Sequence, residues 1–183
     1  MRSKETIFEE YLVAGARIGD RAAIAKLVAF RGPRLLRHAT RPLGNREDAL
    51  DAVQDAWADI ICGLPRLRDD RAFPAWAYRI VTRRAARTVA GHVNRRELGD
   101  AVAAASDAVV SEAGSMAADA HAVRLAIRAL PPTQAAAISL FYLEDMSVAE
   151  VAVALDIPPG TVKTRLMHAR TKLNQALKGE ADE

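Results

Sequence analysis

Residues 97–118, ELGDAVAAASDAVVSEAGSMAA, divide the chain into two parts. The segment consists mainly of small and acidic side chains and holds few large apolar groups. Because it can bury little apolar surface to offset the entropy of ordering, we expect a linker here. The parts on either side are each long enough for a small helical domain. The predicted organisation is a domain over 1–96, a linker over 97–120 and a second domain over 121–183.

Both flanking parts are predicted to be helical, which makes the expected fold all-α. Ala is abundant and favours helices, while no run of alternating β-branched residues indicates a strand. In the first part we expect helices that begin after Asp20, near Asn45 and after Asp70. Gly63 and Pro65 are expected to end the helix that begins near Asn45. Apolar residues at helical spacing define the predicted buried faces: Phe8, Tyr11, Leu12 and Ile18; Ile24, Leu27, Val28, Leu35 and Leu36; Ala49, Val53, Ala56, Trp57, Ile60 and Ile61; Phe73, Trp76, Ala77, Ile80 and Val81.

Charge is distributed unevenly along the chain. Residues 1–96 contain 19 Lys and Arg against 11 Asp and Glu, whereas 97–120 contain five acidic residues and no Lys or Arg. Residues 121–183 contain seven of each sign. A basic first domain indicates a polyanionic partner, although a charge count alone does not identify it.

Several classes of protein do not fit this composition. The single cysteine, Cys62, cannot build a disulfide framework or a four-cysteine metal site, and we expect it to be a buried structural residue in a reducing compartment. The start of the chain has acidic residues where a signal peptide needs an apolar run, and no stretch approaches the length of a membrane span. We therefore expect a cytoplasmic protein with no membrane contact of its own and no cofactor.

The end of the chain carries the pattern of a helix-turn-helix. Ser147 and Glu150 form a predicted capping box that starts a short helix, residues 156–160 form a tight turn, and a last helix is predicted from about Thr161 to Leu177. From Gly160 to Lys178 there are five Lys or Arg and no acidic residue. A helix of this kind enters a major groove, where polar side chains read base edges and basic ones contact phosphates. The alternative is a solvated basic helix in an ordinary bundle.

These segments carry the motifs of a known family. Leu130-Pro131, Ser147 to Ala152 and Gly160 to Arg170 resemble the promoter-binding C-terminal domain of bacterial sigma factors. Two motifs in the first domain also resemble sigma factors, in this case the extracytoplasmic-function (ECF) group. The residues that match are Ala49, Asp51, Val53, Gln54 and Asp55 in the polymerase-binding helix, and Phe73, Trp76, Tyr78, Arg79 and Ile80 in the promoter-melting segment.

The resemblance implies a non-enzymatic protein that binds core RNA polymerase, directs it to a promoter, helps to open the DNA and is held inactive by an anti-sigma factor. The polymerase contacts would be the clamp helices of the large subunit and the flap. The site residues that the resemblance implies fall into three groups: Asp48, Asp51, Gln54 and Asp55 for docking on the clamp; Arg68, Asp69, Asp70, Arg71, Arg79, Arg83, Arg84 and Arg87 for the minus-ten element and its melting; Thr161, Lys163, Thr164, Arg165, Met167, His168 and Arg170 for the minus-thirty-five element.

Within these groups the expected roles differ. The loop 67–71 would line a pocket for a flipped base, and the arginines would hold phosphates. Lys163, Thr164, Met167 and His168 are candidates for contacts to base edges, whereas Arg165, Arg170 and the amides near Thr161 are candidates for phosphate contacts. The sequence departs from the family pattern at four positions: Leu50 stands for an acid, Arg83 for the usual Asn, His168 for Arg, and Pro158 for a capping Ser, with Pro159 as a substitute first helical residue.

Two other functions remain open from the residues. A transcription factor of the response-regulator type shares the C-terminal motif and would bind duplex DNA without polymerase. A metal-dependent nuclease could use the carboxylates of Asp48, Asp51, Asp55 and Asp59, although the chain lacks a second cluster of acids or His and a glycine-rich phosphate loop.

Overall fold

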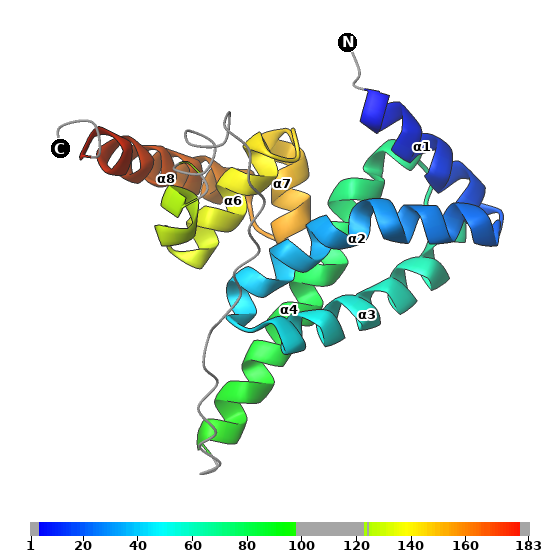
Figure 1. Ribbon diagram of the computed structural model, residues 1–183, viewed down its shortest axis with the longest axis horizontal. Helices are drawn as coiled ribbons and strands as arrows, with labels where there is room; N and C mark the ends of the chain where they lie inside the picture. The colour runs from blue at the N-terminus through cyan, green and yellow to red at the C-terminus, as the bar shows by residue number, and fades with distance from the viewer. Residues whose placement is uncertain (1–3, 98–122, 124, 180–183) are drawn as a thin grey trace. The chain divides into compact units, whose positions relative to one another are not determined.

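The computed structural model describes residues 4–97, 123 and 125–179, and within them the secondary structure is helical with no strand (Figure 1). The predicted all-α class is therefore confirmed. The chain separates into two compact units, Met1–Ser106 and Asp107–Glu183. The segment predicted as a linker, 97–120, lies outside the described residues except for Glu97.

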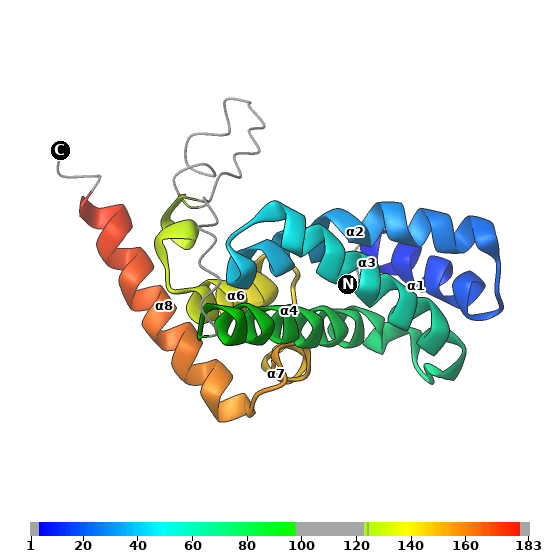
Figure 2. The ribbon, with the colours of Figure 1, turned by 90° about the horizontal axis from the view of Figure 1, so that it is seen from below.

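In its described residues, 4–97, the first unit consists of four helices: α1 (Lys4–Arg17), α2 (Arg21–Leu43), α3 (Arg46–Gly63) and α4 (Phe73–Glu97). Two short 3-10 turns, η1 (Leu64–Arg66) and η2 (Asp70–Ala72), join α3 to α4. The long helix α2 packs against α1, α3 and α4, and α3 also packs against α4 (Figure 2). This arrangement brings one face of α3 beside one face of α4. The residues predicted to dock on the clamp and those predicted to bind the minus-ten element meet there.

The helix starts follow the predicted caps. The Asp20 carboxylate accepts a hydrogen bond from the backbone N–H of Ala22 at 2.8 Å at the start of α2. The side chain of Asn45 accepts one from the N–H of Asp48 at 2.8 Å at the start of α3. Between these helices Gly44 has a φ of 76°, a left-handed conformation that glycine adopts without strain.

The core of the first unit contains most of the predicted residues, and the predictions that are wrong concern α1 and Ile61 of α3, which is exposed. Leu27, Leu35, Ile60, Phe73 and Val81 are buried, as their spacing predicts, and so is Trp57. On α1 only Leu12 of the predicted apolar face is buried, and the prediction is wrong for the other three residues: Tyr11 is 74% and Ile18 is 87% exposed, and Phe8 is also exposed. The residues that α1 buries are Glu9, Leu12, Val13 and Ala16.

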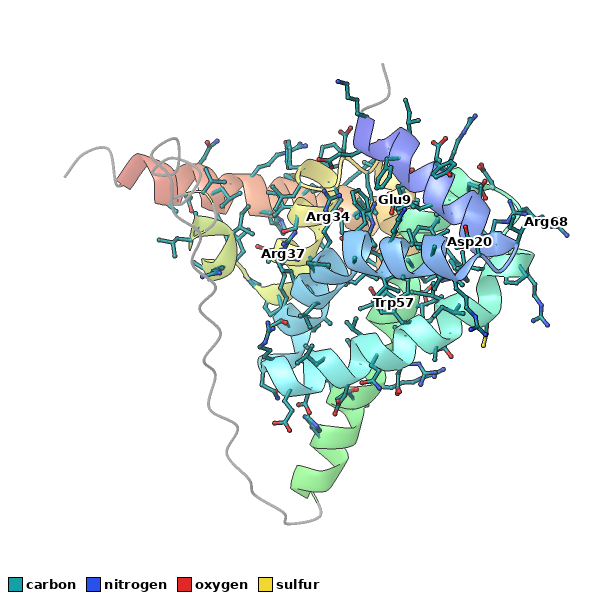
Figure 3. All side chains as sticks on the ribbon, turned by 45° about the vertical axis from the view of Figure 1, so that its right-hand side comes forward. Glu9, Asp20, Arg34, Arg37, Trp57 and Arg68 are labelled. Carbon is teal, nitrogen blue, oxygen red and sulfur yellow. The ribbon has the colours of Figure 1, made fainter. Side chains whose placement is uncertain are left out.

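An ion pair explains why α1 is rotated from its predicted orientation. Glu9 of α1 and Arg31 of α2 are both buried, and Arg31 Nε donates to Glu9 Oε1 at 2.6 Å. Figure 3 shows Glu9 on α1 turned toward the interior. A buried charge is stable only with a partner of opposite charge, so this pair determines which face of α1 lies against α2.

The prediction for Cys62 on α3 needs correction. Cys62 is exposed rather than buried, because it lies two positions after the buried Ile60 on the solvent side of the helix. Gly63 belongs to the last turn of α3, and the helix ends at this residue as expected. A Cβ at Gly63 would lie 2.7 Å from Cζ2 of the half-buried Trp76, so glycine here allows the indole to approach α3.

The second unit contains residues 125–129 in helical conformation, followed by α6 (Pro132–Tyr142), α7 (Val148–Leu155) and α8 (Pro159–Gly179). Both halves of the predicted capping box at Ser147 and Glu150 are present. The helix α8 begins at Pro159, two residues before the predicted start at Thr161. Buried side chains from the three helices form the core of this unit: Ile138, Leu140, Val151, Leu155, Val162, Leu166 and Ala169.

In the described part of the chain, no helix combines the length and the apolar character that crossing a bilayer requires.

Candidate functional site

The predicted docking residues lie on α3 with most of their side chains in solvent. Asp51, Gln54 and Asp55 are exposed, and Asp48 is half-buried because it takes part in the cap at Asn45. The spacing predicted from the sequence therefore places these four side chains on an accessible surface of the first unit.

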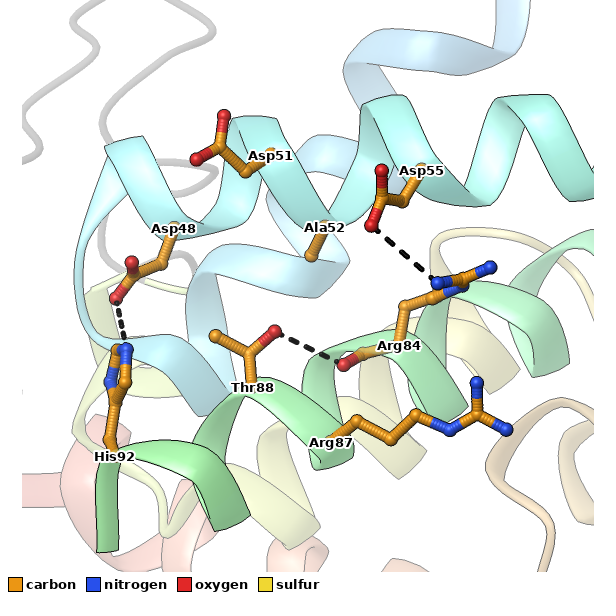
Figure 4. A pocket seen from close by; sticks show the side chains of 8 residues that line it. All are labelled: Asp48, Asp51, Ala52, Asp55, Arg84, Arg87, Thr88 and His92. Carbon is orange, nitrogen blue, oxygen red and sulfur yellow. Dashed lines mark hydrogen bonds and ion pairs between the residues drawn. The ribbon is translucent and has the colours of Figure 1, made fainter. Parts of the chain in front are cut away.

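A hollow of about 400 Å³ lies between α3 and α4 and brings together residues from two predicted groups (Figure 4). From α3 it is lined by three carboxylates of the docking group, and from α4 by two arginines that were expected to contact DNA. The Nε2 atom of His92 lies 3.5 Å from Asp48 Oδ2 at one end of the hollow. The residues that line it are Asp48, Asp51, Ala52, Asp55, Arg84, Arg87, Thr88 and His92.

Arg84 connects the two helices through two ion pairs. Its Nε donates to Asp59 Oδ2 at 2.8 Å, and Nη2 lies 2.6 Å from the same oxygen. Its Nη1 lies 3.5 Å from Asp55 Oδ2. The hydrogen bond to Asp59, together with the negative charges of both carboxylates, raises the pKa of Arg84. The structure therefore pairs Arg84, which the resemblance groups with the DNA-contacting arginines, with Asp59, a residue that belongs to none of the three predicted groups.

The other predicted arginines of α4 follow one another at four-residue intervals. Arg83 and Arg87 are exposed, while Arg79 is half-buried. Residues four apart lie on the same side of a helix, so Arg79, Arg83 and Arg87 share a face from which Arg84 is rotated by about 100°.

The loop before α4 is attached to the first helix. Asp70 Oδ1 accepts a hydrogen bond from Arg17 Nη1 of α1 at 2.7 Å. The carboxylate of Asp69 accepts one from the backbone N–H of Arg71 at 3.0 Å, which caps η2. Arg68, Asp69 and Arg71 are exposed, and Figure 3 shows Arg68 at the edge of the unit. The loop thus presents two basic side chains to solvent while Asp70 fixes its position.

A group of buried polar residues in the first unit was not predicted from the sequence. The Nε2 atom of His38 lies 2.9 Å from Thr82 Oγ1, and the imidazole packs edge-on against the ring of Tyr78, with centroids 5.0 Å apart. Burial, with a smaller effect from Arg41, lowers the pKa of His38 from 6.5 to about 3. This neutral histidine links α2 to α4.

In the second unit α7 and α8 form the predicted helix-turn-helix. The chain turns at Asp156, whose φ of 56° is left-handed and whose N–H bonds back to the carbonyl groups of α7. Thr164 Oγ1 donates to the carbonyl of Gly160 at 3.1 Å. The predicted contact residues lie as expected on the outer part of α8: Lys163, Thr164, Met167, His168 and Arg170 are exposed, and Thr161 and Arg165 are half-buried.

Arg170 is held by two aromatic residues of α6. Its Nε donates to the hydroxyl of Tyr142 at 2.9 Å, and its guanidinium carbon lies 5.7 Å from the ring centroid of Phe141 and 5.6 Å from that of Tyr142. Tyr142 is not among the site residues predicted from the sequence. Only the contact across α6 and α8 reveals its role, since 28 residues separate it from Arg170.

Exposed arginines on the first unit and a helix-turn-helix in the second are typical of a DNA-binding protein. The families described as Sigma-70 region 2 and Sigma-70, region 4 match residues 27–96 and 120–173. The ECF sigma factor SigM of Mycobacterium tuberculosis is 32% identical over 91% of this chain and 83% of its own length. The ECF factor SigW of Bacillus subtilis is 27% identical over 87% of this chain and 91% of its own length.

Two solved structures are also similar to this chain in fold. The structure of CnrH in complex with the cytosolic domain of CnrY matches with a TM-score of 0.60 and 26% identity, and covers 94% of this chain and 98% of that one. The sigma factor RpoE of Bartonella quintana, in complex with the anti-sigma factor NepR, matches the fold with a TM-score of 0.69 at 22% identity, over 84% and 96% of the two chains. The chain belongs to the ECF group of RNA polymerase sigma factors, which are transcription initiation factors.

Proposed function

We propose that this sigma factor uses three separate surfaces to bring core polymerase to a promoter. The domain over 1–96 carries the polymerase-docking and minus-ten surfaces, the segment over 97–120 is the linker, and the domain over 121–183 carries the minus-thirty-five surface. The observation that carries the proposal is the helix α8, which buries Val162 and Leu166 and presents polar and basic side chains to solvent.

The docking surface is the exposed side of α3. Asp51, Gln54 and Asp55 are accessible, and Asp48 lies beside them at the edge of the hollow. Carboxylates grouped in this way are complementary to the basic clamp helices of the large polymerase subunit. The flap would be a second polymerase contact, reached from the second unit.

The minus-ten surface consists of α4 and the loop before it. Arg79, Arg83 and Arg87 share one face of α4, and the arginines of the loop are exposed. Arginines spaced along a surface bind the backbone of a single strand through charge. We leave Arg84 out of this set because its guanidinium contacts Asp59. The loop residues that we assign to this surface are Arg68, Asp69, Asp70 and Arg71.

The minus-thirty-five surface is the outer side of α8. Lys163, Met167 and His168 are exposed and reach base edges in the major groove, together with Thr164. The phosphate contacts come from Arg165, Arg170 and the amides near Thr161, at the positively charged start of the helix.

An anti-sigma factor is part of the proposal. The related CnrH and RpoE were solved in complex with CnrY and NepR, and the RpoE partner is an anti-sigma factor. A partner that covers both domains would block polymerase and promoter together. We further propose that the protein catalyses no reaction itself and acts in the cytoplasm.

Size-exclusion co-elution with sigma-free core polymerase tests this function without knowledge of the promoter. We expect the full chain to co-elute with core, and an excess of the housekeeping sigma factor to abolish the co-elution. Failure to co-elute, with protein shown to be free of any anti-sigma partner, would contradict the proposal. Binding of that protein to duplex DNA alone would then favour a transcription factor that acts without polymerase.

A further inference from the structure

Arg84 lies between two carboxylates that have unequal access to solvent. Asp55 and Asp59 are one helical turn apart on α3, so one guanidinium from α4 reaches both. The contacts to Asp59 are the shorter, at 2.8 and 2.6 Å, against 3.5 Å to Asp55. The side chain of Asp55 is 68% exposed, that of Asp59 44% and that of Arg84 29%.

We propose that Asp59 is a positioning residue for polymerase docking, because by holding Arg84 it leaves the carboxylate of Asp55 available to the polymerase. The inference rests on the proposed docking role of Asp55. It assigns a function to a residue that contacts neither polymerase nor DNA itself and acts only through Arg84.

The geometry of the guanidinium supports this assignment. Arginine donates through a planar fork, so two neighbouring nitrogens of one guanidinium can contact the same carboxylate. With Asp59 present, Nε and Nη2 of Arg84 both contact Oδ2 of Asp59, and only Nη1 approaches Asp55, at the longer distance of 3.5 Å from its Oδ2. Without the charge of Asp59, the guanidinium would turn to Asp55, neutralise it and occupy the oxygens that a basic polymerase residue needs.

The same contacts separate Arg84 from the arginines proposed to bind DNA. Arg84 neighbours Arg83 in the sequence, but its donors face Asp59 of α3 rather than the side of α4 that carries the proposed strand contacts. We therefore expect Arg83 and Arg84 to affect different partners.

The test measures the affinity of the full chain for sigma-free core polymerase at low ionic strength. The substitution Asp59→Asn should weaken core binding by about threefold to fivefold, the range of an exposed ion pair. Adding Arg84→Gln to that variant should restore the affinity to within about twofold of wild type, because no cation then remains to neutralise Asp55. The variant Glu47→Gln removes an equal charge from the exposed start of α3 and is the matched control, with affinity expected within about twofold of wild type.

The restoration separates this role from a structural one. If Asp59→Asn acted by loosening the α3–α4 contact, removal of Arg84 would not repair it, and the doubly substituted protein would bind core no better. That outcome would overturn the inference, as would unchanged binding by Asp59→Asn. A second readout is capture of a minus-ten single strand by holoenzyme at saturating core, where Arg83→Gln should weaken binding and Arg84→Gln should not. Weakening by Arg84→Gln comparable to that of Arg83→Gln would assign Arg84 to DNA and also overturn the inference.

Charge reversal of the docking residues distinguishes this failure from failure of the proposed function. If Asp51→Lys with Asp55→Lys leaves core affinity unchanged, the assignment of the docking surface is wrong, and so is the role of Asp59 that depends on it. If that reversal weakens binding while Asp59→Asn does not, only the role of Asp59 is wrong.

Discussion

The carboxylate of Glu9 and the guanidinium of Arg31 form an ion pair that is buried between α1 and α2. Removing one partner leaves the other charge without compensation in the interior, which costs more than the pair contributes as a pair. The Arg31 guanidinium carbon also lies 5.9 Å from the ring centroids of Phe30 and Tyr78. One ion pair therefore connects α1 to the centre of the first unit.

We expect Glu9→Ala to lower the free energy of unfolding by about 3–5 kcal/mol. The matched control is Glu5→Ala, which breaks the exposed pair between Glu5 and Arg34 on the same two helices and should cost less than about 1 kcal/mol. Urea unfolding followed by circular dichroism measures both values. Equal costs for the two variants would contradict the importance of the buried pair.

The buried His38 should make the first unit less stable in acid. Its pKa is about 3 in the folded chain and 6.5 in the unfolded chain, so between these values the unfolded chain binds a proton that the folded chain does not. The stabilisation is complete above about pH 6.5 and is lost as the pH falls toward 3. From pH 7 to pH 5 we expect a loss of about 2 kcal/mol.

Urea unfolding at a series of pH values tests this dependence. The variant His38→Gln should show a correspondingly smaller loss over the same range, whereas His168→Gln, at an exposed position of α8, should keep the wild-type slope. A wild-type slope in the His38 variant would show that another group is responsible.

Gly63 should not tolerate a methyl group. A Cβ at this position would lie 2.7 Å from Cζ2 and 2.9 Å from Cη2 of Trp76, so Gly63→Ala must displace the indole or α3. We expect destabilisation of about 1–3 kcal/mol. At Gly91, also in a helix, a Cβ meets open space, and Gly91→Ala should stabilise by about 0.5–1 kcal/mol. Thermal unfolding of the two variants should therefore shift in opposite directions.

The two classes of contact proposed for α8 should differ in their sequence dependence. Lys163→Ala, at a proposed base contact, should weaken the free energy of promoter binding by about 1–3 kcal/mol and relax specificity at one promoter position. Arg165→Ala, at a proposed phosphate contact, should weaken binding to all sequences alike and reduce its salt dependence. Selection of promoters from a randomised library by each holoenzyme measures both effects. An unchanged preference at every position in the Lys163 variant would refute its role as a base contact.

The helix boundaries could be predicted closely because their signals are local. Asp20, Asn45 and Ser147 cap helices through hydrogen bonds to residues two or three positions away. The buried face of α1 could not be predicted, since Glu9 lies inside only because Arg31, 22 residues away, faces it. Hydrophobic periodicity assigns a glutamate to solvent whatever its partner is.

The candidate sites show the same division between local and distant signals. The exposed face of α8 could be predicted from its helical spacing, because its buried residues repeat regularly. The pairing of Arg84 with Asp59 joins positions 25 residues apart and depends on how α3 packs against α4. A charge on a helix indicates exposure, but only the packed structure shows which opposite charge lies beside it.

The contact of Arg170 with Tyr142 bears on the entropic cost of promoter binding. An exposed arginine normally samples many rotamers, and fixing it against a phosphate costs about 0.5–1.5 kcal/mol of conformational entropy. The hydroxyl of Tyr142 and the ring of Phe141 already restrict the guanidinium in the free protein. In the proposed phosphate contact, Arg170 would therefore act as a preorganised donor, and part of the ordering cost would be incurred when the protein folds rather than when it binds.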